Sequence, residues 1–364
     1  MVFENRSTNV VMGGGGVKGI AYIGVFAIME RMGYTPANLA GVSAGSLAGA
    51  FAGAGYNSSG MWDIMKKFDF EKVQMDKIPQ KVPVVGHLMD YAKKTGTRND
   101  SLATEFLSKR NIWFDPTGFA DERGGIFGNI ITFCKEGCLF DGDLLEEWVR
   151  TSLAAKGVRT FADLRGGRQD RMNPNGYKVR MTGVDCNRGK LVVLPDDVTF
   201  YGINPDDFEV AKAVRISTCV PFAFKPVEIR SVINGKTRTF NLVDGGVLDS
   251  FPDWVIENTS ERTVGFKLNS GESKFFSLDT PLSILKTLIS AVTNIGVPKE
   301  KTPDFEVEEI NITKVNFLDF NLTEEEKKYM YDAGESAAIS LFSRFEPNKA
   351  QGRKYLRYPF FQRH

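Results

Sequence analysis

Ser43 lies within a stretch that reads Gly41-Val42-Ser43-Ala44-Gly45, a G-x-S-x-G pattern between an apolar run and an Ala/Gly-rich segment. A serine on a sharp strand-to-helix turn holds its hydroxyl clear of the backbone, where it can act as a nucleophile. The helix that follows directs its N-terminus at the same point, which stabilises negative charge. Five small residues also describe an ordinary glycine-rich turn, so the other segments must decide.

The glycine-rich loop Gly13–Gly16, followed by Val17, Lys18 and Gly19, fits two opposed hypotheses. Its G-x-G-x-x-G spacing matches a dinucleotide-binding loop, but such a fold places an acidic residue at the end of the next strand, and this chain has Ser43 there. Alternatively, consecutive glycines let the backbone N–H groups of Gly14, Gly15 and Gly16 converge on one point, which would form an oxyanion hole.

A serine nucleophile needs a base, and histidine is scarce in this chain. The two histidines are His87 and His364, and neither follows a predicted strand. Asp244 ends the apolar stretch Phe240–Val243 and precedes Gly245-Gly246. The C-terminal ends of strands are where α/β active sites lie, so Asp244 is the candidate base, although an aspartate before two glycines is also a common turn former.

The composition describes an ordinary globular protein: 364 residues, 42% hydrophobic, 25% charged and a net charge of +1. This balance gives no argument for a nucleic acid partner. Four cysteines are too few for a disulfide scaffold, and no Cys, His or carboxylate cluster has ligand spacing, so we expect neither a metal nor another cofactor.

The N-terminus lacks the basic-then-apolar pattern of a signal peptide. Leu39–Tyr56 is uncharged but too weakly apolar to insert well into a membrane. Its glycines at positions 45, 49 and 53 predict a smooth helix face lying close against a sheet. We therefore expect no transmembrane helix and a cytoplasmic protein, so that any attachment to membranes would be peripheral.

The elements that must position these residues follow a strand–loop–helix–strand–turn–helix order over the first fifty residues, which predicts the opening of a parallel α/β sheet. Further elements are predicted from apolar periodicity, capping and turn signals. They are strands at Thr8–Met12, Tyr177–Cys186, Leu191–Leu194, Val227–Ile233 and Lys236–Val243, a hairpin turn at Asn234-Gly235, and helices at Ile20–Met32, Asp143–Gly157 (opened by a capping box), Asp207–Ser217 and Thr323–Phe342.

We expect one domain over residues 1–364. Residues 57–139 interrupt the alternation of strands and helices, and they predict either a helical and loop insertion that caps the site or an ordinary second layer of the core. An apolar helical stripe is predicted at 281–296, and residues 256–364 are expected to complete the fold.

The ordered set of Gly-Gly-Gly-x-Lys-Gly at 14–19, Gly-x-Ser-x-Gly at 41–45 and Asp-Gly-Gly at 244–246 resembles the patatin-like phospholipase family. The likeness continues at Leu139–Asp143, Thr160–Leu164, Arg215–Pro221 and Phe224–Val227, and covers roughly residues 8 to 255. It implies an α/β fold of three layers, with a mostly parallel central sheet flanked by helices.

The resemblance also implies a serine acyl hydrolase that cleaves fatty-acyl esters of phospholipids or related membrane lipids through a Ser43–Asp244 dyad. It assigns the oxyanion hole to Gly14, Gly15 and Gly16 and places a charged Lys18 at the rim of the site. Supporting motif positions are Gly19, Gly41, Gly45, Gly245 and Gly246. The implied partners are a lipid ester and a transient membrane surface, without nucleic acid; the oligomeric state stays open. Two other hypotheses remain, a nucleotide-binding protein and a catalytically idle lipid-binding module.

Overall fold

A computed structural model describes residues 6–68, 142–221, 223–233, 235–256, 261–269, 306–315 and 321–345. Eight strands form one sheet in the order β5-β6-β3-β2-β1-β7-β8, and β4 pairs with β3 off this path. The strands are β1 (Arg6–Met12), β2 (Tyr34–Gly41), β3 (Val179–Asp185), β4 (Lys190–Leu194), β5 (Val227–Ile233), β6 (Lys236–Asp244), β7 (Arg262–Asn269) and β8 (Glu306–Asn311).

The pairing of the strands is mixed. β2, β1, β7 and β8 are parallel to their neighbours, and so is β3 to β2. β4 and β6 run antiparallel to β3, and β5 runs antiparallel to β6. The predicted α/β class, with a mostly parallel sheet flanked by helices, is confirmed.

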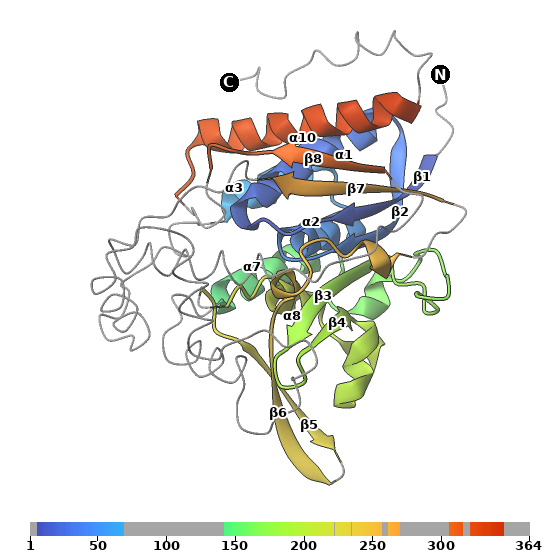
Figure 1. Cartoon of the computed structure of the whole chain (residues 1–364), viewed down its shortest axis with the longest axis vertical. Helices are drawn as coiled ribbons and strands as arrows, with labels where there is room; N and C mark the ends of the chain where they lie inside the picture. The colour runs from blue at the N-terminus through green and yellow to red at the C-terminus, as the bar shows by residue number, and fades with distance from the viewer. Residues whose placement is uncertain are drawn as a thin grey trace, which may run out of the picture.

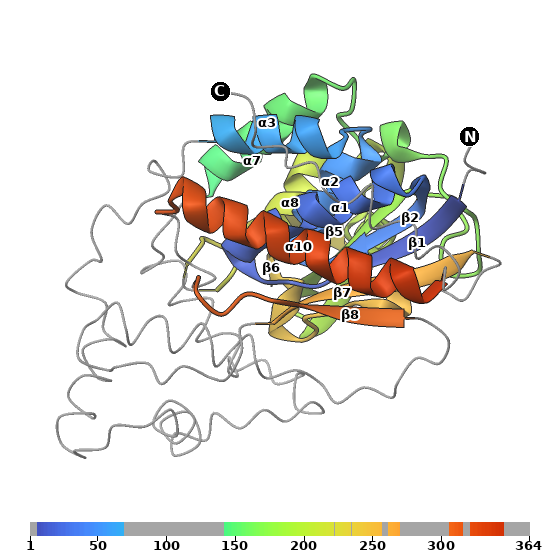
Figure 2. The ribbon, with the colours of Figure 1, turned by 90° about the horizontal axis from the view of Figure 1, so that it is seen from above.

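The helices gather over the sheet, and Figure 2 shows α1, α2, α3 and α7 on one side of β1, β2, β7 and β8. The α-helices of the described residues are α1 (Ala21–Arg31), α2 (Ala44–Gly53), α3 (Ser58–Lys67), α7 (Asp143–Ala154), α8 (Val210–Ser217) and α10 (Glu324–Phe345). Short 3-10 helices are η1 (Gly16–Ile20), η3 (Phe161–Leu164), η4 (Asp196–Tyr201), η5 (Pro205–Asp207), η6 (Gly245–Val247) and η7 (Asp253–Val255).

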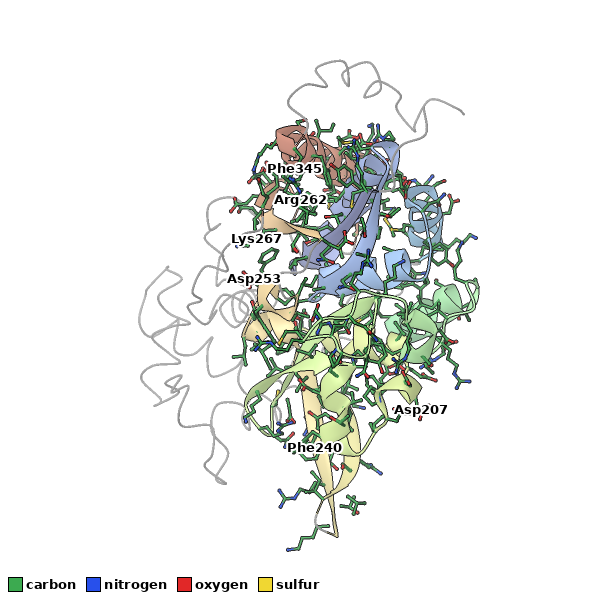
Figure 3. All side chains as sticks on the ribbon, turned by 90° about the vertical axis from the view of Figure 1, so that its right-hand side faces the viewer. Asp207, Phe240, Asp253, Arg262, Lys267 and Phe345 are labelled. Atoms are coloured by element: carbon green, nitrogen blue, oxygen red, sulfur yellow. The ribbon has the colours of Figure 1, made fainter. Side chains whose placement is uncertain are left out.

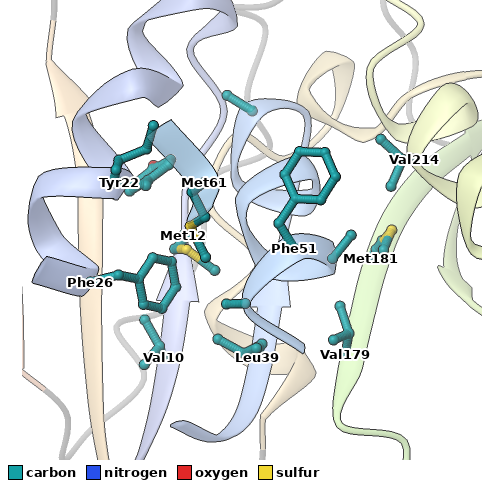
Figure 4. Close-up of a cluster of buried hydrophobic side chains, with 14 of the residues drawn as sticks. Val10, Met12, Tyr22, Phe26, Leu39, Phe51, Met61, Val179, Met181 and Val214 are labelled. Atoms are coloured by element: carbon teal, nitrogen blue, oxygen red, sulfur yellow. The ribbon is translucent and has the colours of Figure 1, made fainter. Parts of the chain in front are cut away.

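The core follows the alternation of side chains along the strands. Val10 and Met12 point to the helices and pack in one cluster with residues of α1 and α2 (Figure 4). Val11 and Ala40 point to the other side, where Phe251 and residues of η7 cover them. Both faces of the central strands are therefore buried, as expected for a layered α/β fold.

Two glycines let α1 and α10 touch backbone to backbone. A Cβ atom on Gly24 would lie 2.1 Å from the carbonyl oxygen of Tyr331. A Cβ atom on Gly334 would lie 1.8 Å from the carbonyl oxygen of Ala21. Any larger residue would separate the helices, so this crossing ties α10 to the first helix of the chain (Figure 1).

Most predicted elements are confirmed. β5 has its predicted bounds, and α10 begins with the predicted capping box, in which Thr323 and Glu326 exchange hydrogen bonds of 2.9 and 3.1 Å. The glycine face of α2 lies against the sheet as expected: a Cβ on Gly45 would meet Met12, and one on Gly53 would meet Val179.

Two helix starts differ from the prediction. Asp143 is the first residue of α7 rather than its cap, because Gly142 takes the N-cap position with φ 83° and no side-chain cap. Residues Pro205–Asp207 form a separate 3-10 turn capped by Asn204, so α8 starts at Val210.

Several predictions fall outside the described residues. Of the proposed insertion, the structure describes α3 and Phe68; residues 69–139 are outside, as is the stripe at 281–296. Beyond residue 256, β7, β8 and α10 are described. Within the described ranges, no helix is both long and apolar enough to cross a membrane.

Candidate active site

Ser43 sits on a strained turn between β2 and α2. It is the N-cap of α2 with φ 53° and ψ −120°, and among the described residues it is the one non-glycine with positive φ. A Cβ on Gly41 would lie 2.4 Å from the carbonyl carbon of Gly45, and one on Gly45 would lie 2.2 Å from the carbonyl oxygen of Met12. The turn therefore requires glycine at both positions, and it holds Ser43 in a backbone conformation that side chains rarely adopt.

The register of the sheet brings Asp244 level with Ser43. Gly41 of β2 pairs with Met181 of β3, and Gly183 of β3 pairs with Asp244 of β6. Two residues beyond Gly41, Ser43 reaches the level of Gly183. Asp244 ends its strand, as predicted. Because β6 runs antiparallel to β3, the pairing of Asp244 with Gly183 brings it next to Ser43, and not a strand direction shared with β2.

Asp244 is buried, with 2% of its surface exposed. Its carboxylate accepts hydrogen bonds from the Ser43 hydroxyl and from the N–H of Gly246, the latter at 2.7 Å. Burial raises the pKa of Asp244 to about 7, and the two hydrogen bonds offset part of that rise. The structure thus joins the two residues that the sequence pointed to as nucleophile and base.

The glycine pair after Asp244 has a steric role. A Cβ on Gly245 would lie 2.5 Å from Oγ1 of Thr182, so only glycine fits against β3 there. Gly246 supplies the N–H that holds one carboxylate oxygen of Asp244. Together they fix the orientation of the carboxylate.

The glycine loop passes directly over Ser43. A Cβ on Gly14 would lie 3.4 Å from the Cβ of Ser43. The N–H of Gly14 donates to the carbonyl of Ser250 at 3.0 Å, whereas no described residue accepts a hydrogen bond from the N–H of Gly15 or Gly16. Two of the three predicted donors therefore have no acceptor in the described part of the chain.

Lys18 does not lie at the rim of the site, and this prediction is wrong. Only 2% of its surface is exposed, and its Nζ donates to the carbonyl of Ile312 at 3.0 Å. The 3-10 turn η1 folds the end of the loop inward, and a Cβ on Gly19 would lie 2.7 Å from the Cβ of Ala44. Lys18 and Gly19 thus anchor the loop against the body of the protein.

Ser217 is a neighbour of the site to which the sequence analysis assigned no role. It is fully buried on α8; its Oγ accepts the N–H of Ser43 at 3.0 Å and donates to the carbonyl of Thr182 at 2.7 Å. The available signal was its place in the Arg215–Pro221 segment, which carried part of the family resemblance.

The described residues contain no group of three His, Cys, Asp or Glu side chains that could hold a metal ion. Cys186 and Cys219 are buried and form no disulfide with each other. His87 and His364, which the sequence analysis set aside as bases, lie outside the described ranges.

Comparisons with known proteins show which family the chain belongs to. The family model described as patatin-like phospholipase matches residues 10–253. An uncharacterised Bacillus subtilis protein, YqhO, is 33% identical over 254 residues, which cover 70% of this chain and 68% of YqhO. Lysophospholipase NTE1 of Scheffersomyces stipitis is 24% identical over 203 residues, half of this chain but 13% of that protein.

Among solved structures, VipD from Legionella pneumophila is similar with a TM-score of 0.45 and 14% identity, covering 94% of this chain and 67% of VipD. The family model spans the glycine loop, the serine turn and Asp244 in one continuous match of more than half of the chain. The chain therefore belongs to the patatin-like phospholipase family of lipid ester hydrolases.

Proposed function

We propose that Ser43 and Asp244 form a catalytic dyad that hydrolyses fatty-acyl esters of membrane phospholipids or related lipids. The hydrogen bond from the Ser43 hydroxyl to the buried Asp244 carboxylate carries this proposal. Asp244 takes the hydroxyl proton as Ser43 attacks the ester carbonyl, then gives it to the leaving alcohol. Water repeats the sequence and releases the fatty acid.

The raised pKa of Asp244 suits it to this role. A carboxylate with an ordinary pKa near 4 is a weak base toward a serine hydroxyl. Burial brings the pKa of Asp244 to about 7, so near neutral pH the carboxylate is both populated and more basic. The dyad then needs no histidine.

The oxyanion hole is best assigned to the N–H groups of Gly15 and Gly16. These donors lack acceptors among the described residues, and Ala44, the first residue of α2, offers a third N–H without a described acceptor. Gly14 would have to leave the carbonyl of Ser250 before it could join them. Each donor of this kind contributes about 2.7–4 kcal/mol to transition-state stabilisation.

In the rival nucleotide-binding hypothesis, a cation of the glycine loop would contact the phosphates. Lys18, the one cation of the loop, is buried and bonded to Ile312. The relatives named lysophospholipase support a lipid substrate instead.

The test compares Ser43→Ala, Asp244→Asn and the double variant on a p-nitrophenyl ester and on mixed phospholipids, with mass spectrometry of the products. Each single variant should lose nearly all turnover, and the double variant should be barely worse, because nucleophile and base act as one unit. Labelling by a fluorophosphonate should disappear in Ser43→Ala. Near-normal turnover in either single variant, or losses that multiply in the double variant, would refute the dyad.

Two matched controls address the histidines. His87→Ala and His364→Ala should keep kcat within a few-fold of the wild type. A loss of about 10⁴-fold in either, the size expected for a broken triad, would replace the dyad by a triad.

A further inference from the structure

β5 and β6 form a ribbon that projects from the body of the protein (Figures 1 and 3). The two strands pair from Val227 with Leu242 out to Ile233 with Lys236. The inner part is packed, because the ring of Phe240 lies 5.1 Å from that of Tyr201 in η4. The outer part is not: Val232 is 70% exposed, the most exposed of the large apolar side chains in the described structure.

The exposed end carries a collar of positive charge. Arg230, Lys236 and Arg238 are exposed, and none of them makes an ion pair or hydrogen bond with the described residues. Between residues 225 and 239 the chain has one acidic residue, Glu228.

Several arginines elsewhere on the surface are paired with acids. Arg150, Arg159, Arg165 and Arg168 each bond a carboxylate at 2.5–3.1 Å. The hairpin end is thus a local concentration of unpaired cations on a protein whose net charge is +1.

We propose that the hairpin tip, made of Arg230, Val232, Lys236 and Arg238, docks on an anionic phospholipid bilayer. Cations near such a surface are attracted to its headgroups, while apolar side chains enter the interface beneath them. The inward-facing backbone groups of the ribbon are paired between the strands, whereas those on its two outer edges need water, so the tip docks at the depth of the headgroups and not in the hydrocarbon.

The docked tip also orients the catalytic site. β6 starts at Lys236 in the tip and ends at Asp244, so one continuous strand links the docking surface to the proposed base. This inference rests on the proposed lipid hydrolase function, because that function requires the protein to meet a bilayer. The exposed Val232 at the tip favours a bilayer over a nucleic acid, whose phosphates offer no apolar partner.

The experiment measures binding to phosphatidylcholine vesicles with and without phosphatidylglycerol by co-sedimentation. The variant R230Q/K236Q/R238Q removes three charges, each expected to contribute about fivefold near the surface, so binding to anionic vesicles should fall about 100-fold. The matched control K66Q/K67Q/K156Q removes three exposed lysines from α3 and the end of α7 and should bind like the wild type. Val232→Ser, which removes the apolar side chain and leaves the charge of the tip unchanged, should also weaken binding.

Turnover of a soluble p-nitrophenyl ester should be unchanged in all these variants, which separates docking from chemistry. Binding of the triple variant equal to that of the wild type, an equal loss in the lysine control, or equal wild-type binding to both kinds of vesicle would overturn the proposal. If the wild type hydrolysed no ester but still bound anionic vesicles through the hairpin, the proposed function would fail while this docking surface stood.

Discussion

Oγ of Ser217 accepts the backbone N–H of Ser43 at 3.0 Å, and thereby ties helix α8 to the strained turn that carries the proposed nucleophile. The same hydroxyl donates to the carbonyl of Thr182 in β3 at 2.7 Å. One buried side chain thus links three elements at the level where Asp244 meets the sheet. In the proposed mechanism, Ser217 therefore acts by positioning Ser43.

Ser217→Ala should lower kcat by about one to two orders of magnitude and leave KM nearly unchanged. The substitution leaves the Ser43 N–H and the Thr182 carbonyl unpaired, which costs about 1–3 kcal/mol and lets the turn relax. Steady-state kinetics on a p-nitrophenyl ester gives both parameters, and Ser217→Thr, which keeps a hydroxyl, should restore part of kcat.

Ser58→Ala is the matched control for this change. Ser58 is also buried, and its hydroxyl donates to Glu30 at 2.7 Å at a site remote from Ser43. It should lose stability to a similar extent without a loss of kcat per folded molecule. Equal effects of the two variants on kcat would show that Ser217 has no positioning role.

The rate of ester hydrolysis should follow the ionisation of Asp244. The base must be unprotonated, and burial raises its pKa to about 7. kcat/KM should therefore rise about tenfold per pH unit below pH 7 and level off above it. A profile that is flat down to about pH 5, or that breaks near pH 4, would mean that Asp244 is not the group that limits the reaction.

Asp244→Asn should make the protein more stable at alkaline pH. The pKa of Asp244 is about 7 in the folded state against 3.8 for an ordinary aspartate, so the folded state binds this proton more tightly. The contribution of this group to stability falls as pH rises from about 4 to 7, by about 1.4 kcal/mol for each unit of difference. Urea unfolding of both proteins at about pH 4 and pH 8 tests this. The free energy of unfolding of the variant should exceed that of the wild type by more at pH 8 than at pH 4. A difference that does not change with pH would contradict a raised pKa of Asp244 in the folded state.

Two glycines of α2 should respond oppositely to the same substitution. Gly45→Ala places a Cβ 2.2 Å from the carbonyl oxygen of Met12 and should prevent folding of the turn. In Gly49→Ala the tightest contact of the new Cβ is with the flexible end of Met12, at 3.3 Å. The higher helix propensity of alanine stabilises the helix by up to about 1 kcal/mol, which offsets the cost of this contact. Thermal unfolding and ester turnover should show a near-native Gly49→Ala beside a failed Gly45→Ala.

Much of this arrangement could be predicted from local chemistry. The Asn234-Gly235 turn signal placed β5 and β6, and the Thr323–Glu326 box marked the start of α10, because both signals act within a few residues. The spacing of Gly45 and its two partners along α2 identified the face that packs on the sheet. Ser43 and Asp244 could be named as candidates because the glycines beside them indicate turns in which a side chain would not fit.

The rest depends on contacts between distant residues. The burial of Lys18 follows from its bond to Ile312, 294 residues away, and no pattern near Lys18 announces it. The role of Ser217 depends on where α8 meets the serine turn, since a serine in a helix is unremarkable by itself. The start of α7 at Asp143 also involves a distant residue. A Cβ on Gly142, the N-cap of this helix, would lie only 2.1 Å from Cζ of Arg215, so the guanidinium requires glycine at this position.

The bond from Lys18 to Ile312 and the backbone contact of α1 with α10 have a consequence for biosynthesis. A ribosome makes the glycine loop and the serine turn early, yet the residues that hold them in place emerge some three hundred residues later. We expect that the site around Ser43, the proposed nucleophile, is not formed in the nascent chain, and that the protein cannot hydrolyse lipid until α10 has left the exit tunnel. Contacts between residues this distant in sequence also form slowly, so we expect hydrolase activity to appear only with the last steps of folding.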